Sequence, residues 1–241
     1  MKNLHEILTD DVFNKNIHLT NPVPMWIIDN FLPENIAKAM YREIIDSDKS
    51  TWKKFTRNDS LMYEQNDMSH VPKAFELISY LHSRNAVESL EKLTGIDGLI
   101  PDPKLIGSGY SWAGTGCTLK PHTDFNWNEQ SKLHRALSLI IYLTPDWNPK
   151  WHGGLDFYDG KREKVIQHVD CLFNRCLIWK YEKLGWHGHV NPMTCPEDIG
   201  RTTVRVFYFT SNSSHNPEDL PHRSQYWMDK NGMPCDNRDQ I

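Results

Sequence analysis

From residue 105 onward the sequence breaks into short apolar segments bounded by Gly, Pro, Asn and Asp, and this pattern restricts the possible folds most strongly. Segments of this length and composition predict β-strands. The predicted strands span residues 105–112, 117–123, 135–144, 154–159, 164–168, 171–174, 176–180, 186–190 and 202–211. About eight short strands after a helical block are typical of a double-sheet jelly roll with helices packed on one outer face.

The first part of the chain has a different, mostly helical pattern. After a short apolar strand at 26–29, apolar residues in helical spacing predict a helix over about 32–46. A second helical block is predicted over about 72–93 and ends at the Gly-containing segment 94–98. We therefore expect an α+β, mainly β chain that forms one domain. Its expected parts are a helical support region (1–104), a jelly-roll core (105–212) and a tail or flap (213–241).

Composition excludes some classes of function. The 241 residues carry a net charge of −4, which argues against nucleic acid or an anionic membrane as the main partner. The sequence lacks an apolar run of membrane-spanning length, and its start lacks the apolar core of a secretory signal. Cysteine stands at positions 117, 171, 176, 195 and 235, with no CxxC pair. We therefore expect free thiols and a soluble, cytoplasmic protein.

A His-x-Asp motif, His122-Thr123-Asp124, ends one of the predicted strands. Residues two apart on a strand point the same way, so His122 and Asp124 share a face. A second histidine from a distant strand would complete a set of two imidazoles and one carboxylate. That set leaves three positions open on an octahedral metal and is typical of non-heme Fe(II) oxygenases. The alternative is a chance pair at the protein surface.

The further histidine comes from Trp186-His187-Gly188-His189. His187 and His189 share one face of their predicted strand, so periodicity does not separate them. We favour His187 as the ligand because it lies deeper in the strand, behind Trp186. His189 would then lie behind the metal site or at the surface. The remaining strand-end and loop histidines, expected to be solvated, are His134, His152, His168, His215 and His222.

Two arginines share a face of the last long strand, Arg201 and Arg205. An arginine that enters a barrel interior needs a partner, because an isolated buried cation is costly. A dicarboxylate ligand could provide this partner through a bidentate contact with Arg201. The alternatives are an outward-facing ion pair and Arg205 in the same role.

Two aromatic residues near the motif are also candidates. Tyr142 lies in an apolar strand, so its phenol needs a hydrogen-bond partner, which would be a co-substrate carboxylate or a backbone carbonyl. Trp112 lies on the strand before the motif, where a tryptophan more often belongs to the core.

With these residues in view, the chain resembles the prolyl 4-hydroxylase-like branch of the Fe(II)/2-oxoglutarate dioxygenases. The resemblance covers nearly the whole chain, and its specific parts are the metal strand and the closing block. The matching segments read IIDNFLPENIAKAM, LTGIDGLIPDP, GTGCTLKPHTDFNW, SLIIYLTPDW and WHGHVNPMTCPEDIGRTTVRVFYFT.

The resemblance implies a double-stranded β-helix with N-terminal helices packed on one sheet. It implies Fe(II), 2-oxoglutarate and O2 as cofactor and co-substrates, with ascorbate as a candidate reductant. The matching iron ligands are His122, Asp124 and His187. Arg201 and Tyr142 match the residues that hold the distal carboxylate of 2-oxoglutarate, and Trp112 stands where the family often has a tyrosine beside it. The presence of Asp124 argues against the related halogenases.

By the same resemblance, we expect hydroxylation of a C–H bond, most simply in a prolyl residue of a peptide or protein, with release of succinate and CO2. The rim residues Asn126, Trp127 and Trp147 would take the extended substrate. One alternative keeps the chemistry but acts on a free amino acid or another small molecule. Another is a jelly-roll module that binds metal without turnover.

Overall fold

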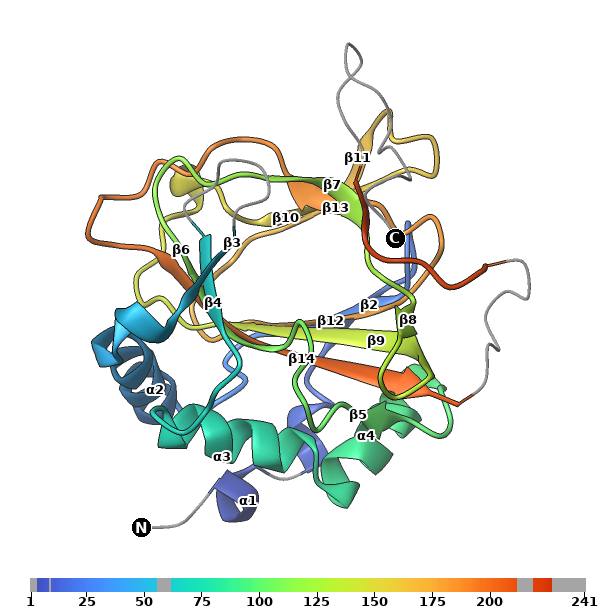
Figure 1. The fold of residues 1–241 in the computed structure, drawn as a ribbon, viewed down its shortest axis with the longest axis horizontal. Coiled ribbons are helices and arrows are strands. Elements are labelled where there is room, and N and C mark those ends of the chain that lie inside the picture. Colours follow the sequence, from blue (N-terminus) through green and yellow to red (C-terminus); the bar gives the residue numbers. More distant parts are fainter. Residues whose placement is uncertain (1–3, 9, 56–61, 212–218, 227–241) are drawn as a thin grey trace.

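The computed structural model describes residues 4–8, 10–55, 62–211 and 219–226, which form two antiparallel β-sheets packed face to face (Figure 1). The larger sheet has the order β1-β2-β12-β9-β14-β6-β4-β3, with β5 paired to β14 and β8 paired to β9. The smaller sheet has the order β11-β10-β13-β7-β15. The predicted double-sheet arrangement is therefore observed.

The strands of the larger sheet come from both halves of the chain. They are β1 (Ile17–Leu19), β2 (Met25–Ile28), β3 (Lys53–Phe55), β4 (Met62–Gln65), β5 (Ile100–Pro101), β6 (Gly109–Ala113), β8 (Trp127–Asn128), β9 (Leu133–Tyr142), β12 (Cys176–Lys180) and β14 (Arg201–Thr210). The smaller sheet contains β7 (Leu119–Thr123), β10 (Leu155–Tyr158), β11 (Val165–Val169), β13 (His187–His189) and β15 (Gln225–Tyr226). The support region is thus not purely helical, because it adds β1 to β5 to the larger sheet.

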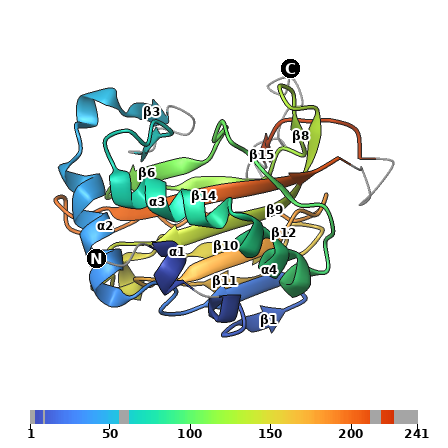
Figure 2. The same ribbon diagram turned by 90° about the horizontal axis from the view of Figure 1, so that it is seen from below.

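Helices lie across the outer face of the larger sheet (Figures 1 and 2). They are α1 (Leu4–Ile7), α2 (Glu34–Asp46), α3 (Pro72–Leu81) and α4 (Arg84–Thr94), with 3-10 turns η1 (Asp10–Val12), η2 (Lys49–Thr51) and η3 (Pro149–Trp151). The helix predicted over 72–93 is two helices. Ser83 separates them in an extended conformation, and its side chain accepts a hydrogen bond from the Ala86 amide, which caps α4.

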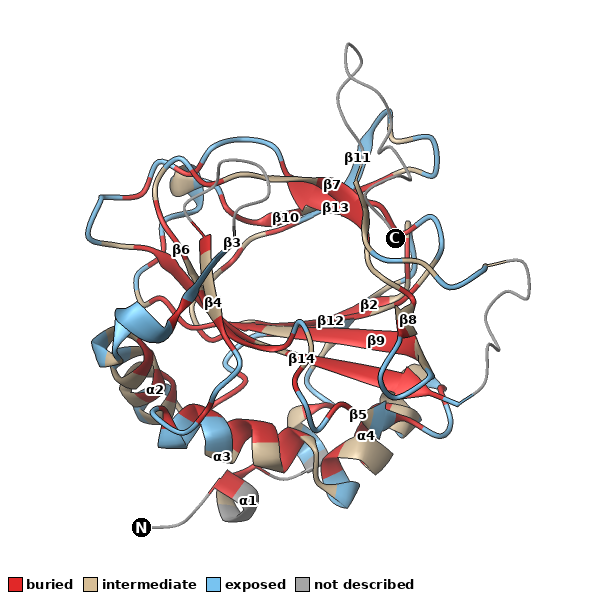
Figure 3. Ribbon diagram, in the orientation of Figure 1, coloured by how far each residue is buried: buried red, intermediate tan, exposed pale blue. Residues whose placement is uncertain are grey.

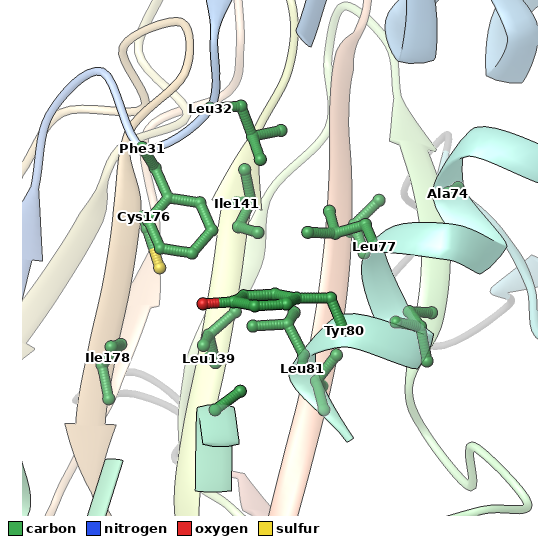
Figure 4. Close-up of a cluster of buried hydrophobic side chains, with 14 of the residues drawn as sticks. Phe31, Leu32, Ala74, Leu77, Tyr80, Leu81, Leu139, Ile141, Cys176 and Ile178 are labelled. Atoms are coloured by element: carbon green, nitrogen blue, oxygen red, sulfur yellow. The ribbon is translucent and has the colours of Figure 1, made fainter. Parts of the chain in front are cut away.

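The main core lies between α3 and the larger sheet (Figure 4). Leu77 and Leu81 of α3 pack toward Leu139 and Ile141 of β9, and the Tyr208 hydroxyl of β14 donates to the Leu81 carbonyl at 2.9 Å. Each such buried side chain stabilises the fold by about 1.5–3 kcal/mol relative to an exposed one. The alternate residues of β9 point to the other side, toward the smaller sheet.

The strand predicted over 171–174 is wrong. Asn174 adopts a left-handed conformation with φ 61°, which an extended strand does not accommodate. Its side-chain amide donates to the Leu32 carbonyl at 2.6 Å, and its side-chain oxygen accepts from the Leu32 amide at 2.9 Å. The segment is therefore a turn within the jelly-roll core, and it fastens this core to the support region at Leu32.

Two register irregularities orient side chains toward the space between the sheets. In the β9–β14 pair, Leu137 lies opposite Tyr208 and Arg135 opposite Phe209, so Ala136 is an extra residue on β9. In the β7–β13 pair, His122 lies opposite His187, but Leu119 lies opposite His189. Each bulge changes the face on which the next side chain falls.

Buried residues follow the strands of both sheets (Figure 3). Among them are the buried free thiols of Cys171, Cys176 and Cys195, as predicted. Cys117 is buried as well, and Cys235 lies outside the described residues. Over the described ranges, the structure contains no helix with the length and apolar character that crossing a bilayer requires.

Candidate active site

Three side chains from the smaller sheet converge between the two sheets. β7 carries His122, the chain turns out at Asp124, and β13 places His187 opposite His122. One potential ligand atom from each residue lies within 4.8 Å of the others. The His122 Nε2 atom is 3.9 Å from Asp124 Oδ1, and the His187 Nε2 atom is 3.8 Å from Asp124 Oδ2. Two imidazoles and a carboxylate at this spacing could hold one divalent metal ion.

Backbone carbonyls orient both imidazoles. The Nδ1 atom of His122 is 3.0 Å from the Lys120 carbonyl oxygen, and Nδ1 of His187 is 2.8 Å from that of Gly185. Because a carbonyl only accepts, the proton belongs on Nδ1 in both rings, and the lone pair on Nε2 is available to a metal. Metal-binding histidines are commonly oriented this way.

His189 lies outside this group of ligand atoms. It is buried, and neither ring nitrogen has a hydrogen-bond partner among the described residues. The structure therefore separates the two histidines that periodicity left equivalent, in favour of His187.

A buried arginine holds the carboxylate of Asp124. Arg135 Nη2 donates to Asp124 Oδ2 at 3.0 Å, and the Ser138 hydroxyl donates to the same oxygen at 3.3 Å. The guanidinium lies over the rings of Phe207 and Phe125, at 3.4 Å and 4.5 Å from their centroids. This arrangement fixes the carboxylate beside both imidazoles.

Sequence reasoning missed Arg135. Strand parity alone places Arg135 with Leu137 and Leu139 on the helix-covered face, and the extra residue at Ala136 moves it to the cavity face. The available signal was a cation at the start of an apolar strand, because a buried arginine requires an acid partner.

The local charges set the protonation of the ligands. Burial lowers the pKa of His122 to about 4, and the nearby positive charge of His187 adds to this effect. Burial would raise the pKa of Asp124, but the charge of Arg135 and the adjacent imidazoles of His187 and His122 outweigh this effect and hold that pKa below its ordinary value. His122 is therefore neutral and Asp124 ionised at neutral pH, as a metal site requires.

We expect the metal-free protein to lose stability as the pH falls from about 6.5 to about 4. His122 takes up a proton near pH 6.5 when unfolded but only near pH 4 when folded, so the unfolded state binds more protons in this window. The loss should reach about 3 kcal/mol, at roughly 1.4 kcal/mol per pKa unit. Denaturant unfolding at several pH values would measure it, with His122→Gln as the control. The prediction would be contradicted if the free energy of unfolding changed with pH equally in the wild-type protein and in His122→Gln.

Replacing Arg135 with methionine should destabilise the metal-free protein by about 3–5 kcal/mol, because it leaves the buried Asp124 carboxylate unpaired. In a chain of this size the melting temperature should fall by roughly 10 °C. A divalent metal should restore part of the loss by replacing the missing positive charge. Ser138→Ala is the matched control, since it removes only a hydroxyl and should cost about 1 kcal/mol. Equal losses in both variants would argue against a dominant ion pair.

A cavity extends from the ligand group toward Arg201 and Tyr142. Arg201 is buried, and Nη1 donates to the Gly153 carbonyl, while Nε has no partner within the described part of the chain. The Tyr142 hydroxyl is also buried and has no hydrogen-bond partner in the ranges that the structure describes, and burial raises its pKa above the ordinary value. No acidic side chain among the described residues forms an ion pair with Arg201. Unpaired donors at the end of this cavity suit the carboxylate of a ligand.

The second candidate arginine also faces the cavity but has a different environment. Arg205 Nη2 donates to the Glu64 carboxylate at 3.0 Å, so Arg205 already has an acidic partner. Arg201 and Arg205 therefore do not compete for one role.

The structure does not bring Trp112 to the cavity. Its neighbour Ser111 lines the cavity, whereas the Trp112 ring points to the other face and packs against Gly114 and Gly200. A Cβ added at Gly200 would lie 2.1 Å from the ring. The expected contact between Trp112 and a co-substrate is therefore corrected to a packing role.

The expected substrate rim is also different from the prediction. Trp147 is buried and donates to the His152 carbonyl at 3.1 Å, and Asn126 is buried as well. Trp127 is partly exposed and donates to Glu129 at 2.8 Å. Of the three predicted rim residues, only Trp127 remains available to a substrate.

Residues 219–226, which we call the C-terminal strap, pack against the ligand group. Asn126 Nδ2 donates to the Leu220 carbonyl at 3.0 Å, and the His222 amide donates to Asn126 Oδ1 at 2.7 Å. The strap ends in β15, which pairs with β7, and the Tyr226 ring stacks on the His122 ring with centroids 5.0 Å apart.

A side-chain cluster fastens the strap from its other side. The Tyr181 hydroxyl donates to Asp219 at 2.7 Å and lies 3.0 Å from His222 Nε2. His222 is thus mostly buried rather than solvated as predicted, whereas His168 is exposed as predicted. His215 lies outside the described residues. Within the predicted tail or flap, the described residues therefore form a docked segment.

The sequence matches the family model of the 2OG-Fe(II) oxygenase superfamily over residues 108–209. A search of curated proteins found no match. The matched range contains all of the metal-ligand candidates, Tyr142 and Arg201.

Solved structures of this fold match nearly the whole chain. A prolyl hydroxylase from Trichoplax adhaerens, in complex with a hypoxia-inducible factor oxygen degradation domain peptide fragment, is 21% identical over 85% of this chain and 90% of its own, with a TM-score of 0.52. A prolyl 4-hydroxylase from Phytophthora capsici is 14% identical, and the match covers 95% of this chain and 70% of that protein, with a TM-score of 0.59. HygX from Streptomyces hygroscopicus, with nickel, 2-oxoglutarate and hygromycin B bound, is 10% identical. The match covers 91% of this chain and 96% of HygX, with a TM-score of 0.53. These similarities confirm the predicted double-stranded β-helix.

Proposed function

We propose that this chain, which matches the family model of the 2OG-Fe(II) oxygenase superfamily over residues 108–209, is a 2-oxoglutarate-dependent dioxygenase that hydroxylates a prolyl residue in a peptide or protein and releases succinate and CO2. The family match favours an enzyme over a metal-binding module without turnover. The observation that carries the proposal is one cavity that contains both the ligand group of His122, Asp124 and His187 and the unpaired donors of Arg201 and Tyr142.

The residues present fit iron and 2-oxoglutarate. The Nε2 lone pairs of His122 and His187 and the Asp124 carboxylate would hold Fe(II) and leave three positions for co-substrates. Bound Fe(II) supplies the oxidising chemistry, which couples decarboxylation of 2-oxoglutarate to hydroxylation by O2.

The chain's own contribution is orientation. Arg201 and Tyr142 would bind the distal carboxylate of 2-oxoglutarate, with Arg201 also tied to the Gly153 carbonyl. Arg135 keeps the Asp124 carboxylate ionised and directed at the imidazoles. The C-terminal strap shields the outer side of the His122 ring from solvent.

The prolyl substrate is supported by structural similarity to prolyl hydroxylases, one of them bound to a peptide. HygX, which has hygromycin B bound, shares the fold, so the experiment below also includes small molecules. The alternative is the same chemistry on a free amino acid or other small molecule.

The test is anaerobic reconstitution with Fe(II) and 2-oxoglutarate, followed by exposure to O2 with a mixed peptide library. Free proline and free arginine are run in parallel. We expect mass spectrometry to show one added oxygen atom on prolyl peptides, with matching release of succinate. Oxygen added only to the free amino acids would overturn the peptide assignment while leaving the enzyme class intact. A weak visible band from Fe(II) and 2-oxoglutarate without O2 would check the site independently of turnover.

A further inference from the structure

Arg205 offers the cavity a cationic group that the proposed co-substrate cannot reach. Arg201, Thr203 and Arg205 alternate along β14 and all line the cavity. Four residues of extended strand separate Arg201 from Arg205, which is about 13 Å between their backbones. Because the backbones are this far apart, a carboxylate that binds Arg201 does not also contact Arg205.

The hydrogen bonds divide the cavity into two parts. The Thr203 hydroxyl is bonded to Ser111 at 2.7 Å, between the two arginines. On one side, Arg201 lies with Tyr142 and the Gly153 carbonyl. On the other side, Arg205 lies beside Glu64 of β4. A ligand at Arg205 would thus be separate from one at Arg201.

Arg205 keeps donors that the protein does not use. Its side chain is 18% exposed, and its contact with Glu64 engages Nη2 alone. The Nε atom is buried and has no acceptor among the described residues. A buried N–H without a partner is costly, so an acceptor from a ligand at this position gains more than it would on the open surface.

The charges around the cavity favour an anionic ligand. Arg135, Arg201 and Arg205 all line it. Asp124 pairs with Arg135 and would also bind the metal, while Glu64 is the partner of Arg205 and is itself 30% exposed. A divalent metal and doubly negative 2-oxoglutarate would cancel each other, so the three arginines still exceed the two carboxylates by one positive charge.

On the basis of the proposed function, we propose that Arg205 binds a carboxylate of the substrate close to the carbon that is hydroxylated. The enzyme then selects acidic substrates. The carboxylate comes either from an Asp or Glu side chain beside the target residue in a peptide or from the α-carboxylate of a free amino acid. Glu64 holds the guanidinium in place while the unused donors face the ligand.

The experiment compares carboxylate probes with their neutral amides. The peptide arm uses blocked tripeptides with central proline and either Asp or Asn on one side. The small-molecule arm uses free proline and prolinamide. Binding is followed through the perturbation of the visible band of the anaerobic protein with Fe(II) and 2-oxoglutarate, and hydroxylation is followed by mass spectrometry. The wild-type protein should bind at least one carboxylate probe about ten- to a hundredfold more tightly than its amide.

Arg205→Gln should remove this preference, with the loss confined to the carboxylate probes. Its partner Glu64 is partly exposed and can be solvated, so folding should survive. Arg205→Lys should keep part of the preference, because it retains the charge but loses the planar fork. Glu64→Gln should strengthen carboxylate binding a few fold by removing a competing anion. Arg84→Gln is the matched control, since it removes an exposed arginine from a helical ion pair with Glu88.

Equal affinity of the wild-type protein for carboxylate and amide probes would overturn the proposal, whether or not any probe is hydroxylated. An Arg205→Gln variant that keeps the preference would overturn it as well. Failure of the proposed function gives a different result: the preference in binding remains, but no proline gains oxygen. The arm, peptide or small molecule, in which the carboxylate probe is preferred more strongly over its amide identifies the source of the carboxylate.

Discussion

Replacing His122 with alanine is expected to abolish iron-dependent release of succinate from 2-oxoglutarate. The variant removes one of the three candidate ligands, whose atoms lie within 4.8 Å of one another. Loss of residues that merely support a metal ligand costs about 10- to 100-fold, so loss of a ligand should exceed about a hundredfold. Asp124→Ala should have the same effect. Turnover and bound iron per chain would be measured together.

His187 and His189 provide a matched pair for this prediction. His187→Ala should lose iron as His122→Ala does, whereas His189→Ala should retain it, because His189 lies outside the ligand group. Both residues are buried on the same short strand, so general damage to β13 would affect both variants. Full turnover in His122→Ala or Asp124→Ala, or iron lost only in His189→Ala, would refute the ligand set.

Replacing Arg201 with glutamine is expected to raise the KM for 2-oxoglutarate by about a hundredfold. The variant loses a buried cation without an acidic partner, and hydrogen bonds between charged groups are worth about 1.5–3 kcal/mol each. Tyr142→Phe should have a smaller effect, about tenfold, because a neutral hydroxyl donates a single hydrogen bond. Steady-state kinetics at saturating iron would provide both values.

A co-substrate without the distal carboxylate tests the assignment directly. 2-Oxopentanoate has the same chain length as 2-oxoglutarate but ends in a methyl group. Its weak use by the wild-type enzyme should be unchanged or improved in Arg201→Gln. If Arg201→Gln reduces turnover with 2-oxoglutarate and with 2-oxopentanoate by the same factor, Arg201 does not act on the distal carboxylate.

Local rules were sufficient for the parts of the site that depend on a single strand. Alternation along one strand put His122 and Asp124 together, and the strand pattern predicted the two-sheet fold. The same rule could not distinguish His187 from His189, because they share a face. Only the register between β13 and β7 separates them.

Other parts depend on contacts that no short segment encodes. The bulge at Ala136 reverses the face of Arg135, and it arises from the pairing of β9 with β14. Glu64 and Arg205 meet across 141 residues of sequence. Trp112 occupies the face opposite the cavity because Gly114 and Gly200 leave room for its ring. In each case tertiary packing, rather than local pattern, decides the outcome.

The stacking of Tyr226 on His122 makes the docking of the strap and the loading of iron thermodynamically dependent on each other. If iron fixes the imidazole in the orientation that Tyr226 covers, it must favour docking by the same free energy by which docking favours iron. Backbone amides of Gln225 and Tyr226 would then exchange with deuterium more slowly in the iron-loaded protein. The strap would thereby report the occupancy of a site that it contacts through the His122 ring.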